Sequence, residues 1–103
     1  MKEMNCCLTL VCHQSLEERL VDHLLQHPEW VRGFTLSSSE GASQKEHLPT
    51  VLEQVRGRSH RRKFMCVMNL EDARAMIDHL KQEEHNSEIA YWITPVLEFG
   101  RLE

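Results

Sequence analysis

Basic residues are concentrated in one short segment of an otherwise acidic chain. Five permanent positive charges and one histidine fall within residues 56–63: Arg56, Arg58, His60, Arg61, Arg62 and Lys63. Arginine binds phosphate and carboxylate oxygens through two parallel hydrogen bonds, so the segment is a candidate anion or nucleotide site. If residues 60–63 begin a strand, Arg61 and Lys63 point to one face, and His60 and Arg62 to the other. They cannot all serve one pocket in one subunit.

Two other interpretations of this segment stay open. It can be a solvated strand end that balances acidic neighbours and discourages edge-to-edge aggregation. It can also be a patch that binds a partner protein or nucleic acid. Nucleic acid is disfavoured, because 12 Lys and Arg stand against 16 Asp and Glu, a net charge of −4, and no aromatic residue interleaves with the basic run.

Metal binding is a second candidate chemistry, since the chain has seven histidines and four cysteines. Cys6 and Cys12 lie about 20 Å apart in an extended strand, too far for one ion. If the first and third strands are parallel central neighbours, a soft ligand set suited to Cu(I) forms near their ends: Cys12, His13, Cys66 and Met68. Ordinary core sulfur explains the same residues. His23 and His27 share a helix face at i, i+4 but lack a third ligand.

Catalysis has little support in the sequence. The adjacent pair Cys12–His13 cannot act as nucleophile and base, because successive strand side chains point apart. Residues 37–39, Ser-Ser-Ser, lack the context of a nucleophile elbow. The four glycines are isolated from one another, so no glycine-rich phosphate loop exists. The sequence therefore favours a protein that is not an enzyme.

The length and composition are those of one globular domain. The chain has 103 residues, 41% apolar and 27% charged, and we expect one domain over residues 1–103. No stretch approaches the ~20 apolar residues of a membrane span, and no cleavage pattern follows the apolar run at 6–12. The four cysteines show no paired spacing, so we expect buried reduced thiols and a cytoplasmic protein.

Hydrophobic periodicity predicts the elements that position these residues. The expected strands are 6–13, 31–39, 60–69 and 88–94, with 96–99 as an edge continuation after Pro95. One long helix is expected to begin with a capping box of Ser15 and Glu18 and to end at about His27, before Pro28. Asn69 is expected to cap the second long helix.

The region between the second and third strands is the least apolar part of the chain. We expect a flexible polar loop at 38–49 and a short helix at 50–57, which starts with a second capping box of Thr50 and Glu53. The two strand–helix units align at an offset of 56 residues, so that 21–24 falls on 77–80. Two such βαβ halves predict an α+β, ferredoxin-like split βαβ fold, with an antiparallel four-stranded sheet and both helices on one face.

Two separated segments resemble a family of short bacterial PII-like proteins within the PII/CutA-like superfamily. Residues 52–58, LEQVRGR, followed by Arg61 and Arg62, look like that family's helix-and-arginine element, and 91–101, YWITPVLEFGR, is similar to its end. The resemblance covers residues 6–101. It implies a homotrimer whose sheets face a common axis, ligand clefts between subunits, and genes beside heavy-metal efflux systems. The chain departs from PII itself, because its long loop has no tyrosine and the PII nucleotide-binding glycines are not matched.

These observations together predict a non-catalytic, PII-like trimeric regulatory or sensor protein. The expected ligand is a small anion, with an adenine nucleotide as the candidate, held by Arg56, Arg58, His60, Arg61 and Arg62. The loop at 38–49 would order on binding and dock on a partner protein such as a membrane transporter. One alternative is a CutA-like protein that binds copper or a similar metal. Another is a structural interaction domain with no small ligand.

Overall fold

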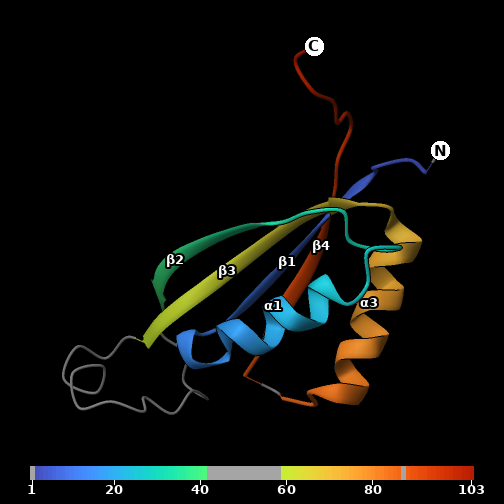
Figure 1. Cartoon of the computed structure of the whole chain (residues 1–103). Helices are drawn as coiled ribbons and strands as arrows, with labels where there is room; N and C mark the ends of the chain where they lie inside the picture. Colours follow the sequence, from blue (N-terminus) through green and yellow to red (C-terminus); the bar gives the residue numbers. More distant parts are fainter. Residues whose placement is uncertain (1, 42–58, 87) are drawn as a thin grey trace.

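The computed structural model describes residues 2–41, 59–86 and 88–103 (Figure 1). Four strands and two long helices follow one another along this part of the chain. Their order is β1 (Cys6–His13), a 3-10 turn (Gln14–Leu16), α1 (Glu17–Leu25), β2 (Thr35–Gly41), β3 (Ser59–Met68), α3 (Leu70–Glu83) and β4 (Ala90–Pro95).

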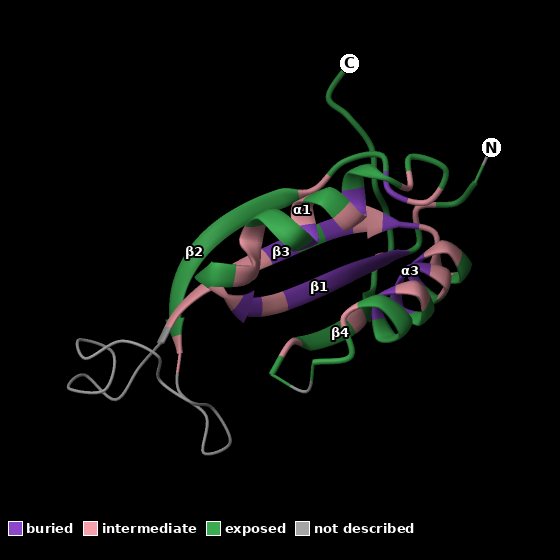
Figure 2. Ribbon diagram, turned by 60° about the horizontal axis from the view of Figure 1, so that its bottom comes forward, coloured by how far each residue is buried: buried purple, intermediate pink, exposed green. Residues whose placement is uncertain are grey.

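The strands form one sheet in the order β2-β3-β1-β4, with β1 and β3 in the middle. Both helices lie against the same face of this sheet (Figures 1 and 2). No helix among the described residues covers the other face, which we call the open face (Figure 2). This arrangement confirms the α+β, ferredoxin-like split βαβ fold. One detail of the prediction is wrong: β1 and β3 are antiparallel neighbours, with Cys6 opposite Met68 and His13 opposite Arg61. In this fold the two strands joined by each helix are not neighbours, because a strand of the other half lies between them. That intervening strand is antiparallel to both, so the two central strands run in opposite directions.

The core lies between the sheet and the helices. Alternate residues of β1 and β3 point towards the helices, which is why Leu8, Leu10 and Phe64 are completely buried while Met65 is not. Helical spacing brings the apolar stripes of both helices onto them: Leu20 and Leu24 from α1, and Ala73, Met76, Ile77 and Leu80 from α3. Burying each large aliphatic side chain contributes about 2 kcal/mol.

The two long helices begin differently. Asn69 caps α3 as predicted, because its Oδ1 accepts a hydrogen bond of 3.0 Å from the amide of Glu71. The predicted capping box of Ser15 and Glu18 is wrong. Instead, Nδ1 of His13 accepts from the amide of Ser15 at 3.1 Å and starts the 3-10 turn. His13 is the last residue of β1, and its extended backbone allows its ring to reach the amide of Ser15.

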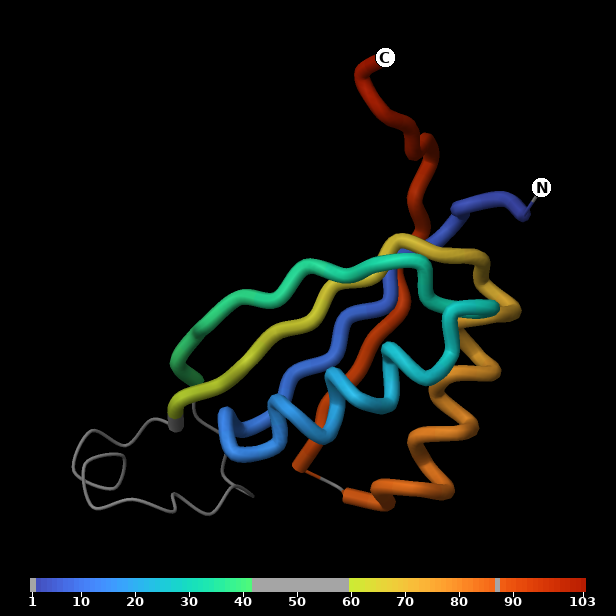
Figure 3. The backbone as a smooth tube through the Cα atoms, viewed as in Figure 1, coloured from blue at the N-terminus to red at the C-terminus, as the bar shows by residue number. Residues whose placement is uncertain are grey.

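The edges of the expected elements shift by a few residues. The loop predicted at 38–49 begins too early, because residues 38–41 pair with β3 and belong to β2. The remainder of that loop and the short helix predicted at 50–57 lie outside the described residues. Beyond β4, the amide of Val96 still donates to the carbonyl of Asn5, but the chain then leads away from the body with Leu97 fully exposed (Figure 3).

All four cysteines are buried free thiols, as expected. No helix in the described part of the chain has the length and apolar character needed to cross a membrane.

Candidate functional site

The basic start of β3 is divided between the two faces of the sheet. Arg62 lies opposite Cys12, a core residue, and so points to the helix side, whereas Arg61 lies opposite His13. Lys63 shares the open face with Arg61, because side chains alternate along a strand. The fold therefore places these side chains as the alternation predicted. Arg56 and Arg58, the other arginines of the proposed ligand set, lie outside the described residues.

Arg62 is engaged within its own chain. Its Nε donates a hydrogen bond of 2.5 Å to Oε1 of Glu17, at the start of α1. Both side chains are partly buried, so the pair forms on the helix side of the sheet. A carboxylate in the first turn of a helix is also favoured by the helix dipole. Arg62 therefore ties the beginning of β3 to α1.

Arg61 and Lys63 lie beside hydroxyl groups of the neighbouring strand. The register pairs Arg61 with Ser39 and Lys63 with Ser37, and all four side chains belong to the open face. We call these four residues the β3 basic patch. The Arg61 guanidinium lies directly against Gly41, where an added Cβ would be 2.6 Å from its Cζ. Cations and hydroxyl donors on adjacent strands can bind an anion through charge-assisted hydrogen bonds. His60, opposite Glu40, lies one residue before the patch.

The structure does not gather the predicted soft-metal set. Cys66 lies opposite Leu8, four residues from Cys12 along β1, which separates the two thiols by about 13 Å. Met68 lies still farther from Cys12, opposite Cys6, and Nδ1 of His13 caps the 3-10 turn. The set fails because it assumed parallel strands. Among the residues the structure describes, no three His, Cys, Asp or Glu side chains are placed to hold a metal ion.

Burial also opposes the thiolate form that soft metals prefer. It raises the pKa of Cys12 to about 11, with a further rise from the nearby Glu17 carboxylate. Burial raises the pKa of Cys66 to about 12. Both groups are therefore protonated at neutral pH, which suits ordinary core sulfur.

Three histidines meet where α1 and α3 pack together. The ring centroid of His79 lies 5.4 Å from that of His23 and 4.5 Å from that of His27. The sequence showed the spacing of His23 and His27 but not their neighbour on α3. A signal was present, because the internal repeat aligns His23 with His79. Equivalent residues of the two halves are therefore in contact.

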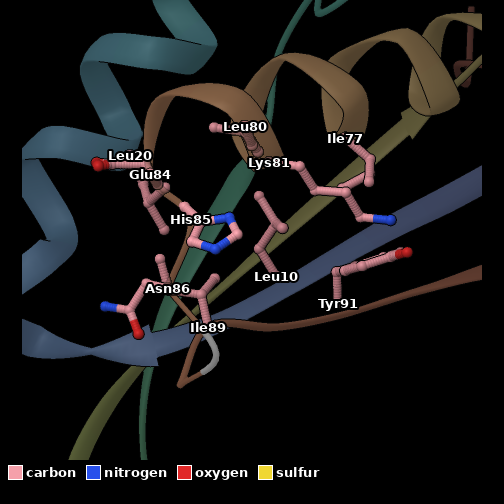
Figure 4. A pocket seen from close by; sticks show the side chains of 10 residues that line it. All are labelled: Leu10, Leu20, Ile77, Leu80, Lys81, Glu84, His85, Asn86, Ile89 and Tyr91. Carbon is pink, nitrogen blue, oxygen red and sulfur yellow. The ribbon is translucent and has the colours of Figure 1, made fainter.

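A pocket of about 520 Å³ lies at the C-terminal end of α3 (Figure 4). Its floor comes from three elements and the turn before β4, and it is apolar: Leu10, Leu20, Ile77, Leu80 and Ile89. Polar side chains surround its mouth: Lys81, Glu84, His85, Asn86 and Tyr91. Nothing in the sequence indicated this pocket, because its walls come from four segments that only the fold brings together.

Comparisons with known proteins agree with this architecture. A family model described as "Protein of unknown function (DUF3240)" matches residues 2–103. No curated protein matches the sequence. A solved DUF3240 family protein from Shewanella baltica OS155 is 22% identical, with a TM-score of 0.77, and the match covers 98% of this chain and 99% of that one.

Two further solved structures extend the likeness to PII-like proteins. CPII from Thiomonas intermedia K12, a nitrogen regulatory PII-like protein bound to ADP, AMP and bicarbonate, is 12% identical over 96% of both chains, with a TM-score of 0.72. A putative PII-like signalling protein from Thermus thermophilus is 16% identical, with a TM-score of 0.64, over 89% of this chain and 86% of that one. The fold is PII-like, and the resemblance noted in the sequence is confirmed.

Proposed function

This chain belongs to the DUF3240 family, and from that premise we propose that it is a non-catalytic PII-like regulatory protein that binds a small anionic ligand beside its β3 basic patch. The observation that carries the proposal is the division of the arginines. Arg62 points to the helix side, where it bonds Glu17, while Arg61 and Lys63 point to the open face beside two serine hydroxyls. In the sequence, Arg56 and Arg58 come shortly before Arg61, and we assign them to the same site.

An adenine nucleotide is the candidate ligand. CPII, whose fold this chain shares, binds ADP and AMP in its solved structure. Phosphate groups suit arginine and lysine side chains that lie beside hydroxyl donors. The patch lies on the face of the sheet that neither α1 nor α3 covers (Figure 2), so we assign the remaining wall of the cleft to a second subunit.

The open face of the sheet supports assembly into a homotrimer. Met65 and Trp92 are each 44% exposed there, and they lie on either side of Thr9 in one row across three strands. Large apolar side chains exposed in a row are typical of a subunit interface. Lys63 of the patch lies two residues before Met65 on β3, so a trimer packed through this row leaves the basic patch near the subunit boundary. Light scattering should then give a mass three times 12.1 kDa, and Trp92→Glu should lower it.

Regulation would proceed through a partner protein, and a membrane transporter is the candidate partner. We propose that the protein acts in the cytoplasm. Binding of the anion would favour one arrangement of the segment that follows β2, and the partner would recognise that arrangement. The buried free thiols support a reducing compartment. A CutA-like metal function has less support, because the antiparallel register separates Cys12 from Cys66.

Titration calorimetry of the full chain with ATP, ADP and AMP tests the ligand. We expect saturable binding of at least one nucleotide. The double variant Arg61→Ala/Lys63→Ala should bind it at least tenfold more weakly, because two cations are lost. Arg74→Ala removes an exposed arginine of α3 and should bind as the wild type does.

Two results would count against the proposal. No binding of any of the three nucleotides by the wild type would exclude the nucleotide. Unchanged affinity in the double variant would move the anion site away from the β3 basic patch.

A further inference from the structure

The pocket at the end of α3 has the features of a small-molecule site separate from the basic patch. It lies on the helix side of the sheet, whereas the patch lies on the open face. Its volume of about 520 Å³ is within the range in which proteins bind small ligands. Four of its floor residues, Leu10, Leu20, Ile77 and Leu80, are core residues, so the floor is held rigidly by the same packing that stabilises the fold.

The charges around the mouth are not equivalent. The Glu84 side chain is only 6% exposed, and Arg19 of α1 neutralises its charge, with Nη2 2.6 Å from Oε2. His23 Nε2 lies 3.6 Å from Oε1. This carboxylate therefore closes the wall of the pocket towards α1. Lys81 lies on the same helix, one turn earlier, and is exposed. Its ammonium is held over the ring of Tyr91, 5.4 Å from the centroid. The mouth thus presents a positive charge at a fixed place.

His85 adds a second feature of a ligand site. It has a positive φ of 39°, in the left-handed region, directly after α3 ends. A glycine would adopt this conformation at lower cost. With histidine there, the ring is one of the pocket-lining side chains, and Figure 4 shows it on the same side of the pocket as Glu84. The residue that follows a helix end often takes this conformation, and here it places the histidine among the residues that line the pocket.

We propose that this pocket binds a small amphipathic monocarboxylate, with its apolar body on the floor of leucines and isoleucines and its carboxylate at Lys81. The apolar floor and the volume of the cavity suit a ligand with an apolar body. The single cation at the mouth selects a carboxylate over a neutral head group. Glu84 is already paired with Arg19, so Lys81 is the lining residue that receives the ligand's carboxylate.

The test is a titration with straight-chain saturated acids from hexanoate to decanoate, and with the matched alcohols, below their micelle concentrations. We expect the dissociation constant to fall about threefold to fourfold for each added methylene group until the cavity is full. Amide chemical shifts in a two-dimensional NMR spectrum should move at Ile77, Leu80 and Ile89, and not at Arg61 or Lys63. Carboxylates should bind at least fivefold more tightly than alcohols of equal length.

A matched pair of variants tests the head group. Lys81→Met keeps the aliphatic stem over Tyr91 but removes the charge, and should abolish the preference for acids while alcohols bind as before. Arg74→Met removes a cation from the same helix outside the pocket and should change neither.

Three results would overturn the proposal: no binding of any acid at millimolar concentration, shifts confined to the open face of the sheet, or an undiminished preference for acids in Lys81→Met. None of them bears on nucleotide binding at the β3 basic patch, so the two proposals fail separately.

Discussion

Arg62 on β3 is bonded to Glu17 at the start of α1, 45 residues away in the sequence. The contact joins the first turn of a helix to the strand that enters the middle of the sheet. It explains why the basic run is not a uniform surface: one of its arginines is a structural partner, and its neighbours on either side face the opposite way. The ion pair can be tested independently of any ligand.

Arg62→Ala should lower the free energy of unfolding by about 1 kcal/mol, the upper range for a partly exposed ion pair. A double-mutant cycle with Glu17→Gln in urea denaturation measures the coupling, because each single change removes the same contact. Arg61→Ala, on the other face, should show no coupling to Glu17→Gln. Additive effects of Arg62→Ala and Glu17→Gln would mean that the pair contributes nothing to stability.

Buried thiols make the protein sensitive to alkaline pH. The pKa of Cys66 is raised from 9.0 to about 12, and that of Cys12 to about 11, mainly by burial. A raised folded-state pKa stabilises the fold below the unfolded-state value, and this contribution is lost as the pH rises through the folded-state value. We therefore expect the urea midpoint to fall from pH 9 towards pH 11.

Cys66→Val isolates this effect from other groups that titrate in the same range. The variant keeps a buried apolar side chain, so its midpoint should fall less steeply above pH 9 than that of the wild type. At pH 8 the native wild type should react with iodoacetamide far more slowly than the unfolded chain, because the thiolate is the reactive form. Equal rates would contradict the burial of these thiols.

The histidines between α1 and α3 are not fully satisfied. Nε2 of His79 and Nδ1 of His23 are buried without a hydrogen-bond partner among the described residues. A buried unpaired polar atom costs about 1 kcal/mol or more. His79→Phe keeps a ring against His27 and removes the unpaired nitrogen, so thermal or urea unfolding at pH 8 should show a gain of about 1 kcal/mol.

His27→Phe is the matched control. Its Nδ1 is paired with Oε1 of Glu29 at 2.8 Å, so this change loses a bond and should give no gain. A clear loss of stability in His79→Phe would indicate that its nitrogen has a partner that the described residues do not include, such as an ordered water.

Local patterns predicted most of the fold because they act over a few residues. The alternation in β3 placed Arg61 and Arg62 on opposite faces, and Asn69 was recognised as a cap. The prediction of the first helix cap was wrong because two residues could bind the same backbone amides. Ser15 has the residue type of a helix cap, but His13 ends a strand close enough to bind its amide first.

The candidate sites were predicted less well, since they depend on contacts between distant segments. The set of Cys12 and Cys66 required a particular strand direction, and the observed direction separates them. The pocket beneath Lys81 needs β1, both helices and the start of β4 at once. The periodicity of a single segment cannot predict a pocket that several segments form together.

The sequence by itself determined which residues form strands and helices and which of their faces are apolar, because side-chain direction follows from backbone period alone. It also determined the concentration of charge at the start of β3. The tertiary structure decided what those residues meet. The antiparallel register assigned Arg62 to Glu17 and dispersed the sulfur ligands, and the packing of α1 against α3 joined His79 to His23. Register and packing are set by the whole core at once, so no single segment of the sequence contains them.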